Sequence, residues 1–358
     1  MSRFLCVDIG AGTMDVLYFD DESGVHYKAV AKSPVLHVAE TAASLSGDLF
    51  VTGCEMGGGP VTRVLTERTR EAEVVMTAAA AMTVHHDLDR VRATGIHVMD
   101  DQEAQSVSLR ADHAKLDLAD LDLDRLKWLV DGFGVPFAFD VIGICAQDHG
   151  MPPPGISHLD YRHNLFKARL DDTPVPQALL FAGDQVPATF NRLRMIAQRA
   201  GALPVDEVYV MDSGMAAILG ASMDSSARGK ERILVLDIAT SHTVGAALQQ
   251  QEIVGFFEYH THDLGLERLE VLLHDLADGK LDHHQVLREG GHGAYTRSAF
   301  GFEAAEVIIA TGPKRRLVAN SRLPITFGAP WGDNMMTGTV GILEAIRRVK
   351  GLKAIHYL

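Results

Sequence analysis

The chain begins with two apolar runs that are separated by a short polar link containing glycine. Residues 3–9 (RFLCVDI) and 14–19 (MDVLYF) are almost continuously apolar, as buried strands are. The link at 10–13 is Gly-Ala-Gly-Thr, and glycine permits the positive φ angles of a tight turn. We therefore predict a β-hairpin whose turn leaves the backbone accessible to a ligand.

The same pattern returns about 230 residues later. Residues 232–248 (RILVLDIATSHTVGAAL) again contain an apolar strand, an Asp-Ile pair, small and hydroxyl residues, and a second apolar strand. Asp237 matches Asp8 in this pattern, and the hydroxyl residues that follow it are Thr240, Ser241 and Thr243. Two such units indicate an internal duplication, in which each half of the chain supplies one hairpin to a shared cleft.

Between and after the hairpins the chain alternates strand-like and helix-like segments, which predicts an α/β protein. Further strands are expected at 25–31, 48–52 and 136–145. Helices are expected at 36–45, 61–72, 78–91, 115–130, 190–200 and 264–277. Residues 149–187 contain six of the thirteen prolines, three of them at 152–154, so we expect a loop-rich insertion or lid there.

The first hairpin turn has the chemistry of an anion site. The backbone N–H groups of Gly10, Ala11 and Gly12 can point at one phosphate, and Thr13 adds a hydroxyl donor. Asp8 would be costly in a buried strand without a partner, whereas beside a magnesium–phosphate pair its carboxylate holds the cation. The alternative is a plain hairpin whose aspartate accepts hydrogen bonds from the turn.

Five motifs, in this order, make the chain resemble the superfamily of actin, sugar kinases and heat-shock chaperone ATPases. They are DIGAGTMD at 8–15, VYVMDSGMAAILGA at 208–221, DIATSHT at 237–243, EVIIATGPKRRL at 306–317 and GDNMMTGTVGILEAIRRV at 332–349. The resemblance implies an α/β fold of two ribonuclease-H-like domains, each a mixed sheet flanked by helices, with ATP in the central cleft and Mg²⁺ at Asp8 and Asp237. It also implies a domain boundary between residues 205 and 206, with the helix at 332–349 crossing back to the first domain.

On the same resemblance, the adenosine side of the site includes Thr311, Gly312 and Lys314. The chain departs from the family pattern here, because only one glycine stands in the turn where two are usual. It also has Ala239 and Ser241 where the second phosphate motif usually has glycines. Two alternatives therefore stay open. The adenosine site is tighter than usual or degraded, or the chain keeps the fold and binds another phosphate compound or none. A solvated basic start of a helix is the alternative for Lys314.

More narrowly, the pattern is similar to an uncharacterised prokaryotic family sometimes labelled as related to pyruvate formate-lyase activating enzyme. Radical activases of that kind need a three-cysteine iron–sulfur motif. The three cysteines of this chain are far apart in sequence and form no C-x-x-C pair, so neither that cluster nor a disulfide framework is expected. None of the seventeen histidines has a metal-binding spacing, and we expect them in polar loops and on the surface.

Two further segments are candidates for the binding of the substrate. Gly57, Gly58 and Gly59 precede Pro60 and Thr62 at the start of a predicted helix, where free amides favour an anion. A flexible loop that only turns the chain is the alternative for these glycines.

The second candidate segment follows the strand predicted at 136–145. Gln147, Asp148, His149 and Gly150 come after it and resemble the G-Q-x-H-G stretch near the substrate of carbohydrate kinases. Asp148 would accept a proton from a substrate hydroxyl and His149 would orient it, with Gln147 touching the substrate. A capped turn with hydrogen-bonded side chains is the alternative.

Asp212 lies just before an alanine-rich helix at the predicted domain crossing. Its side chain suits the N-cap of that helix, and on the resemblance it positions magnesium or the attacking water. The two roles are compatible.

Composition limits the partners. The 358 residues carry a formal charge of −14, which argues against nucleic-acid binding, and no apolar run reaches the length of a membrane span. With no signal peptide apparent, we expect a cytoplasmic protein. Three functions follow: an ATP-dependent kinase of a small molecule, an ATPase that activates or chaperones a client enzyme by domain closure, or a filament protein or non-catalytic relative. The oligomeric state stays open, with a homodimer among the alternatives.

Overall fold

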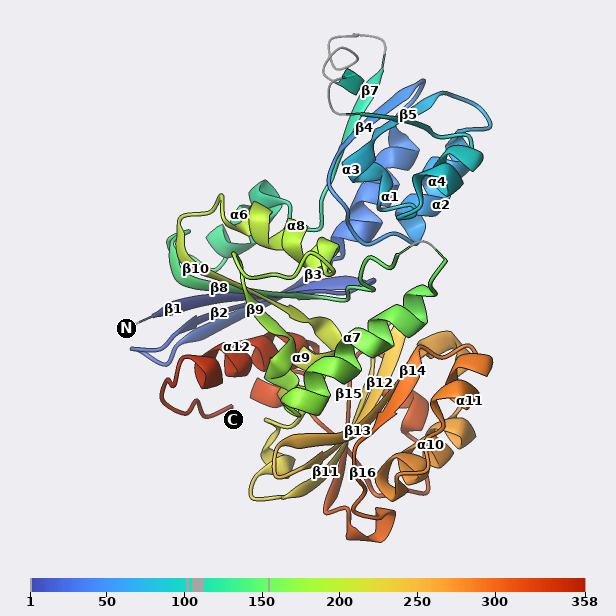
Figure 1. The fold of residues 1–358 in the computed structure, drawn as a ribbon. Coiled ribbons are helices and arrows are strands. Elements are labelled where there is room, and N and C mark those ends of the chain that lie inside the picture. The colour runs from blue at the N-terminus through green and yellow to red at the C-terminus, as the bar shows by residue number, and fades with distance from the viewer. Residues whose placement is uncertain (1, 101–102, 105–112, 154, 358) are drawn as a thin grey trace.

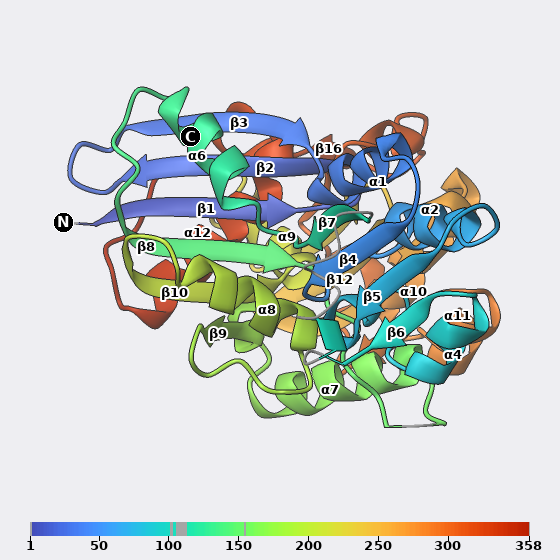
Figure 2. The ribbon, with the colours of Figure 1, turned by 90° about the horizontal axis from the view of Figure 1, so that it is seen from above.

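The computed structural model describes residues 2–100, 103–104, 113–153 and 155–357, and Figure 1 shows their arrangement. Two six-stranded sheets lie one above the other, and a smaller four-stranded sheet stands beyond one end of the first (Figures 1 and 2). Pro154, part of the proline run at 152–154, lies outside the described residues.

The first large sheet has the strand order β3-β2-β1-β8-β10-β9. The three N-terminal strands pair antiparallel, β8 and β10 run parallel to β1, and β9 pairs antiparallel with β10. The strands are β1 (Arg3–Ile9), β2 (Thr13–Asp20), β3 (His26–Lys32), β8 (Phe139–Ala146), β9 (Leu180–Ala182) and β10 (Val205–Asp212).

The second large sheet repeats this arrangement with the order β14-β13-β12-β11-β15-β16. Its hairpin strands β11 and β12 pair antiparallel, and β15 lies parallel on the other side of β11. The strands are β11 (Arg232–Ile238), β12 (His242–Gln249), β13 (Glu252–His260), β14 (Gly293–Thr296), β15 (Val307–Thr311) and β16 (Ile325–Phe327). An antiparallel meander followed by parallel strands beside its first strand is the ribonuclease-H-like sheet, and its occurrence twice confirms the predicted fold.

The predicted domain boundary falls within β10, which pairs with β8 in the first sheet from Val205 onwards. The division into residues 1–205 and 206–358 stays a proposal.

The third sheet is parallel, has the order β6-β5-β4-β7, and is inserted between β3 and β8. The strands are β4 (Leu49–Gly53), β5 (Val74–Thr77), β6 (His97–Met99) and β7 (Ala114–Leu118). The helices that precede, connect or follow its strands are α1 (Pro34–Ser44), α2 (Pro60–Arg68), α3 (Ala78–Ala81) and α4 (Leu88–Ala93). The sequence predicted several of these elements but did not indicate that they form a separate sheet with its own core.

Helices cover both faces of the first sheet (Figure 1). On its outer face lie α6 (Leu123–Asp131) and α8 (Asn191–Ala200), and between the two large sheets lie α9 (Ser213–Ala221) and α12 (Thr337–Val349). The long helix α7 (His158–Asp172) runs alongside, and α10 (Leu266–Asp278) and α11 (His283–Arg288) flank the second sheet. The largest buried cluster joins residues of both large sheets through α9 and α12.

Glycines allow α9 and α12 to pack with their backbones in contact. A methyl group at Gly341 would lie 1.8 Å from the carbonyl oxygen of Ala216, and one at Gly220 would lie 1.8 Å from that of Thr337. Such distances are impossible, so only glycine fits at these two positions. The segment at 332–349, predicted to cross back as one helix, forms α12 only from Thr337 onwards, and α12 packs against β1 and β8 of the first sheet.

Short 3₁₀ helices complete the described chain: Pro176–Leu179, Ser225–Ala227, Thr261–Asp263, Phe302–Ala304, Arg315–Val318, Pro330–Gly332 and Asn334–Met336. Among the described residues, no helix combines the length and the apolar character that a membrane crossing requires.

Three predicted elements were wrong in kind. Residues 115–130 form the end of β7 and most of α6 rather than one helix, and residues 78–91 are interrupted between α3 and α4. The segment at 149–187 is not mainly loop, because α7, the 3₁₀ helix Pro176–Leu179 and β9 contribute 15, 4 and 3 residues, which is 22 of its 39. The leucines at 116 and 118 belong to a strand, and their spacing mimicked a helical pattern only when combined with that of α6.

Candidate functional site

The two hairpin turns lie directly opposite each other. In the first, Gly10 N–H donates to the carbonyl oxygen of Thr13 (3.0 Å), and in the second Ala239 N–H donates to that of His242 (3.0 Å). A methyl group at Gly12 would lie only 2.9 Å from Thr240 Oγ1. The turns of the two duplicated units therefore face each other at close range, as the internal repeat predicts.

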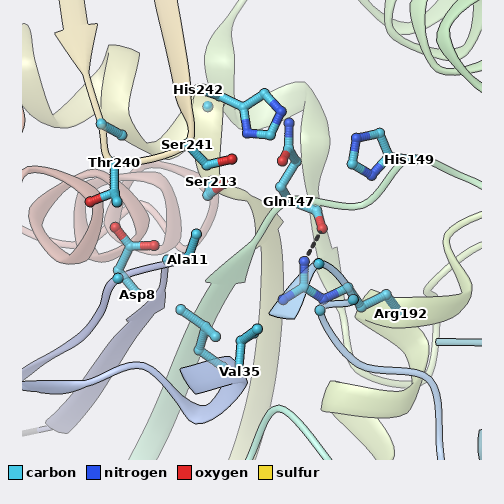
Figure 3. Close-up of a pocket in the computed structure, with 18 of the residues that line it drawn as sticks. Asp8, Ala11, Val35, Gln147, His149, Arg192, Ser213, Thr240, Ser241 and His242 are labelled. Carbon is cyan, nitrogen blue, oxygen red and sulfur yellow. Dashed lines mark hydrogen bonds between the residues drawn. The ribbon is translucent and has the colours of Figure 1, made fainter. Parts of the chain in front are cut away.

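Both turns line one cavity of about 590 Å³, a typical size for a small-molecule site. Figure 3 shows Asp8 and Ala11 of the first unit close to Thr240 and Ser241 of the second, with Gln147, His149 and His242 in another part of the wall. The wall also includes Gly57, Gly58 and Gly59 from the small sheet, and Gly312, Asn334 and Met335 from the second half of the chain.

Three carboxylates gather at the base of the hairpins. Burial, together with the negative charges of Asp237 and Asp212, raises the pKa of Asp8 to about 7. Burial and the charge of Asp8 raise the pKa of Asp15 to about 8. Burial raises the pKa of Asp237 to about 6, although the hydroxyl of Thr311 donates a hydrogen bond to it (2.8 Å).

This base fits a hard divalent cation. The Oδ1 atoms of Asp8 and Asp15 are buried and accept no hydrogen bond from the described residues. Carboxylate oxygens are the ligands that Mg²⁺ prefers, and a cation would compensate their mutual repulsion. Gly338, in the first turn of α12, is so close that a methyl group there would lie 2.0 Å from Asp8 Oδ2, so the positive end of this helix faces the carboxylate.

Several residues that were predicted to bind the nucleotide do not line the cavity. Thr243 is buried and its hydroxyl bonds that of Thr261 (3.0 Å), Thr311 is buried against Asp237, and Lys314 is exposed. Successive residues of a strand point to opposite faces, so His242 faces the cavity and Thr243 faces away. Gly10, Ala11, Gly12, Thr13, Asp237, Thr240, Ser241 and Gly312 all line it.

The glycine run at 57–59 lies in the cavity wall, and Pro60 begins α2 as expected. The N–H of Gly57 donates to Asp120 Oδ1 (3.1 Å), so this amide already has a partner. Thr62 lies outside the wall, and its hydroxyl donates to the carbonyl oxygen of Thr83 (3.2 Å).

The side chain of Asp148 does not reach the cavity that its neighbours Gln147 and His149 line. Gln147 and His149 line the cavity, whereas Asp148 is buried and accepts hydrogen bonds from the N–H groups of Gly150 (2.7 Å) and Leu193 (3.0 Å). Burial raises the pKa of Asp148 to about 6. This is the capped turn that the sequence left as the alternative, and it places Asp148 away from a substrate in the cavity.

Asp212 caps α9, accepting hydrogen bonds from the N–H groups of Gly214 (3.0 Å) and Met215 (3.2 Å). Its other oxygen accepts a hydrogen bond from Arg162 (3.0 Å), and Arg162 lies 3.3 Å from Glu258 Oε2. This buried ionic centre joins α7 to both large sheets, because Asp212 ends β10 and Glu258 lies in β13. The sequence predicted the cap but not Arg162 or Glu258.

Gln147 and Arg192 link the cavity wall to this centre. The side-chain amide of Gln147 donates to Glu258 Oε1 (2.5 Å), and the main-chain carbonyl oxygen of Gln147 accepts from Arg192 (2.6 Å; dashed in Figure 3). Arg192 also holds Asp120 through two hydrogen bonds of 2.7 and 2.8 Å. No local spacing indicated these partners, because they are 45 to 111 residues apart in the chain.

A second pair, the buried Glu55 and the half-buried His86, faces the cavity from the side of the small sheet. His86 Nε2 lies 2.7 Å from Glu55 Oε1, and Asn191 donates to Glu55 Oε2 (2.5 Å). Burial acts to lower the pKa of His86, but the hydrogen bond and charge of Glu55 raise it overall. Sequence reasoning missed both residues, although Glu55 lies in the same segment as the glycine run.

Histidines also gather at the cavity, contrary to the expectation that they lie in loops and on the surface. Burial lowers the pKa of His149 well below its ordinary value and that of His242 to about 3, so both imidazoles are neutral at pH 7.

Solved structures that are similar to the chain span almost its whole length at low identity. The ROK hexokinase from Thermus thermophilus is 13% identical, with 98% of this chain and 99% of that chain covered and a TM-score of 0.31. The filament protein AlfA from a Bacillus subtilis plasmid is 10% identical (96% and 98% covered, TM-score 0.39). The activator of 2-hydroxyisocaproyl-CoA dehydratase from Clostridium difficile is 9% identical (99% of each chain covered, TM-score 0.31). Nothing about function follows from scores this low.

The comparison with curated proteins finds no match. A family model matches residues 56–317, nearly three quarters of the chain, and the narrower resemblance seen in the sequence is thereby confirmed. The chain belongs to the family described as "Putative pyruvate format-lyase activating enzyme (DUF1786)".

Proposed function

We propose that the protein binds ATP with Mg²⁺ between its two hairpins and transfers a phosphoryl group to a small molecule. The observation that carries the proposal is the pair of glycine- and hydroxyl-containing turns that face each other across one cavity, with Asp8 and Asp237 behind them. Phosphoryl transfer requires positioning and charge stabilisation more than covalent help from the protein, and this arrangement supplies both.

The chain's own residues would hold the nucleotide in the following way. The backbone amides of Gly10, Ala11 and Gly12 and the hydroxyls of Thr13, Thr240 and Ser241 would donate to phosphate oxygens. Asp8 and Asp237 would hold Mg²⁺. Gly312, whose carbonyl accepts from Asn334 (3.1 Å), lies at the wall where the adenosine would lie. Bound ATP supplies the activated phosphoryl group.

The acceptor would bind on the side of the small sheet. The Gly57–Gly59 loop and the Glu55–His86 pair face the cavity there. In this proposal His86, which is held by Glu55, would accept a proton from a substrate hydroxyl. Asp148 would position Gln147 and His149 through the turn that it caps, and Asp212 would position Arg162.

An ATPase that activates a client enzyme is the second candidate. The observation that favours it is the Arg162 centre, because a buried ion pair between the two large sheets would be repacked when they move relative to each other. Radical activation through an iron–sulfur cluster is not proposed for either candidate, because the sequence has no three-cysteine motif. Neither metal-competent cluster found among the described residues contains a cysteine.

Calorimetric titration with ATP and Mg²⁺ tests the proposal. We expect wild-type protein to bind, Asp8→Asn and Asp237→Asn to lose at least about 100-fold in affinity, and Asp206→Asn, at an exposed position of β10, to bind like wild type. Equal heats in all four proteins would overturn it. Release of ADP that depends on a small hydroxyl compound supports the kinase, and ADP release stimulated by a protein supports the activator.

A further inference from the structure

Four histidines from distant parts of the chain meet beside the cavity. His149 follows β8, His242 begins β12, His260 ends β13, and His292 precedes β14. The ring centroids of His242, His260 and His292 lie 4.5–4.6 Å apart, and that of His149 lies 5.7 Å from His292 and 6.2 Å from His242. His242 and His260 are direct partners in the β12–β13 register, which fixes their proximity.

Three of these rings bring their nitrogen atoms close to one another. One ring nitrogen of each of His149, His242 and His292 lies within 4.8 Å of those of the other two. Tetrahedral Zn²⁺ with bonds of about 2.0–2.1 Å places its ligand atoms about 3.3 Å apart, so the three nitrogens would move closer together when they bind the ion. We propose that His149, His242 and His292 bind a divalent transition-metal ion of the Zn²⁺ class.

Unpartnered buried nitrogens are the second observation. His242 Nε2 is buried and has no hydrogen-bond partner among the described residues, and the buried His292 Nδ1 makes no hydrogen bond of good geometry there, with Glu258 Oε1 3.5 Å away. Buried polar atoms are nearly always partnered in folded proteins, and a nitrogen lone pair without a donor is available to a metal. A hydrogen-bonded histidine cluster would instead pair these atoms with one another.

The surroundings suit a metal ligand. His292 Nε2 lies 3.1 Å from His260 Nε2. When His292 carries its proton on Nε2 and donates it to His260, the lone pair of His292 is on Nδ1. Such a hydrogen bond on the far nitrogen is the usual support of a ligating imidazole. Glu258 Oε1 lies 3.5 Å from His292 Nδ1 and is close enough to orient this imidazole.

Ligand type distinguishes this site from the one at Asp8 and Asp237. Imidazole favours Zn²⁺, Ni²⁺, Cu²⁺ and Fe²⁺, whereas Mg²⁺ prefers oxygen ligands.

The site would keep an open coordination position. His149 and His242 line the cavity, and Figure 3 shows both rings in its wall, whereas His292 is buried behind them. Three protein ligands leave a fourth position of the tetrahedron, and here it faces the cavity. We expect it to take water or an oxygen atom of the cavity ligand, such as a carboxylate or phosphate oxygen.

Titration of the untagged full-length chain with Zn²⁺ tests the inference, after treatment with a chelator and with no nucleotide present. We expect one Zn²⁺ per chain. With Co²⁺ in its place we expect the strong visible d–d absorption of a tetrahedral site, which gives a blue solution. His149→Ala and His242→Ala should each reduce Zn²⁺ affinity at least 100-fold. His262→Ala, an exposed histidine just beyond β13, should bind like wild type.

Thermal unfolding without metal checks that each variant is folded. Added Zn²⁺ should raise the midpoint of thermal unfolding of wild type and of His262→Ala, but not of His149→Ala or His242→Ala. Absence of stoichiometric binding by wild type would overturn the inference, and so would undiminished binding by His149→Ala and His242→Ala. Because no nucleotide is used, failure here leaves the ATP proposal untouched. Asp8→Asn should retain Zn²⁺ affinity while losing ATP.

Discussion

Arg162 is the residue whose loss we expect to destabilise the protein most. Its guanidinium is 4% exposed, lies between the carboxylates of Asp212 and Glu258, and stacks 4.2 Å above the ring of Phe166. Arg162→Met keeps an unbranched side chain in place of the aliphatic part of the arginine but leaves two buried carboxylates, 1% and 7% exposed, without their cation. Breaking a buried ion pair on one side costs about 3–5 kcal/mol, and we expect a loss of unfolding free energy in that range.

The pH dependence of this loss follows from the two carboxyl groups. Burial acts to raise the pKa of Glu258, but Arg162 and the nearby histidines hold it well below its ordinary value. In wild type, Glu258 therefore stabilises the fold above pH 4.5, and this contribution is lost as the pH falls. Without Arg162, both carboxyl groups bind protons more tightly in the folded state. The difference between the two proteins should therefore be smaller at pH 4 than at pH 8.

Urea denaturation followed by circular dichroism and by tryptophan fluorescence measures the effect, with coincident transitions as the check on two-state behaviour. Lys167→Met on the same helix is the matched control. Lys167 pairs with Asp171 at the surface, with both side chains about half exposed, and such pairs contribute less than about 1 kcal/mol. If Arg162→Met cost no more than Lys167→Met, the reasoning about the ionic centre would be refuted.

Two further predictions concern stability. Gly341→Ala should lower the unfolding free energy by about 2–3 kcal/mol or more, because its methyl group would overlap the carbonyl of Ala216. Gly265→Ala has open space around it and should cost no more than about 1 kcal/mol, the cost of alanine at the N-cap of α10. Equal effects in urea denaturation would contradict the close packing of α9 and α12. Asp15→Asn should flatten the pH dependence of stability measured without Mg²⁺. Since the folded pKa of Asp15 is raised from 3.8 to about 8, wild type loses up to about 1.4 kcal/mol per unit as the pH rises through this window, and parallel curves for the two proteins would contradict the prediction.

The hairpins could be predicted from sequence because everything that specifies them is local. An apolar run of five to eight residues, a glycine or hydroxyl turn and a second apolar run determine a hairpin by themselves, and the repeat of this pattern indicated the duplicated fold. The N-cap role of Asp212 and the helix start at Pro60 are equally local, and both appear in the structure.

The small sheet was not predicted because its four strands are short, three to five residues each, and pair across 49–118 without any adjacent hairpin. Parallel pairing of this kind leaves no periodic signature that distinguishes it from loops or buried helix. The correction at Asp148 has a local cause instead. Gln147 and His149 line the cavity, whereas Asp148 between them accepts hydrogen bonds from the N–H groups of Gly150 and Leu193, as an aspartate that caps its own turn does.

What the sequence by itself determined is therefore the pair of turns, the fold class and the acidic residues behind the turns, because neighbouring residues carry that information. Only the tertiary structure brought Arg162 to Asp212 and Glu258, Glu55 to His86, and His149 to His242 and His292. These groups come from segments whose distance in space depends on strand register, on the glycine-mediated approach of α9 and α12, and on the placement of the small sheet. No single stretch of the chain encodes those quantities, since they result from packing all of the layers together.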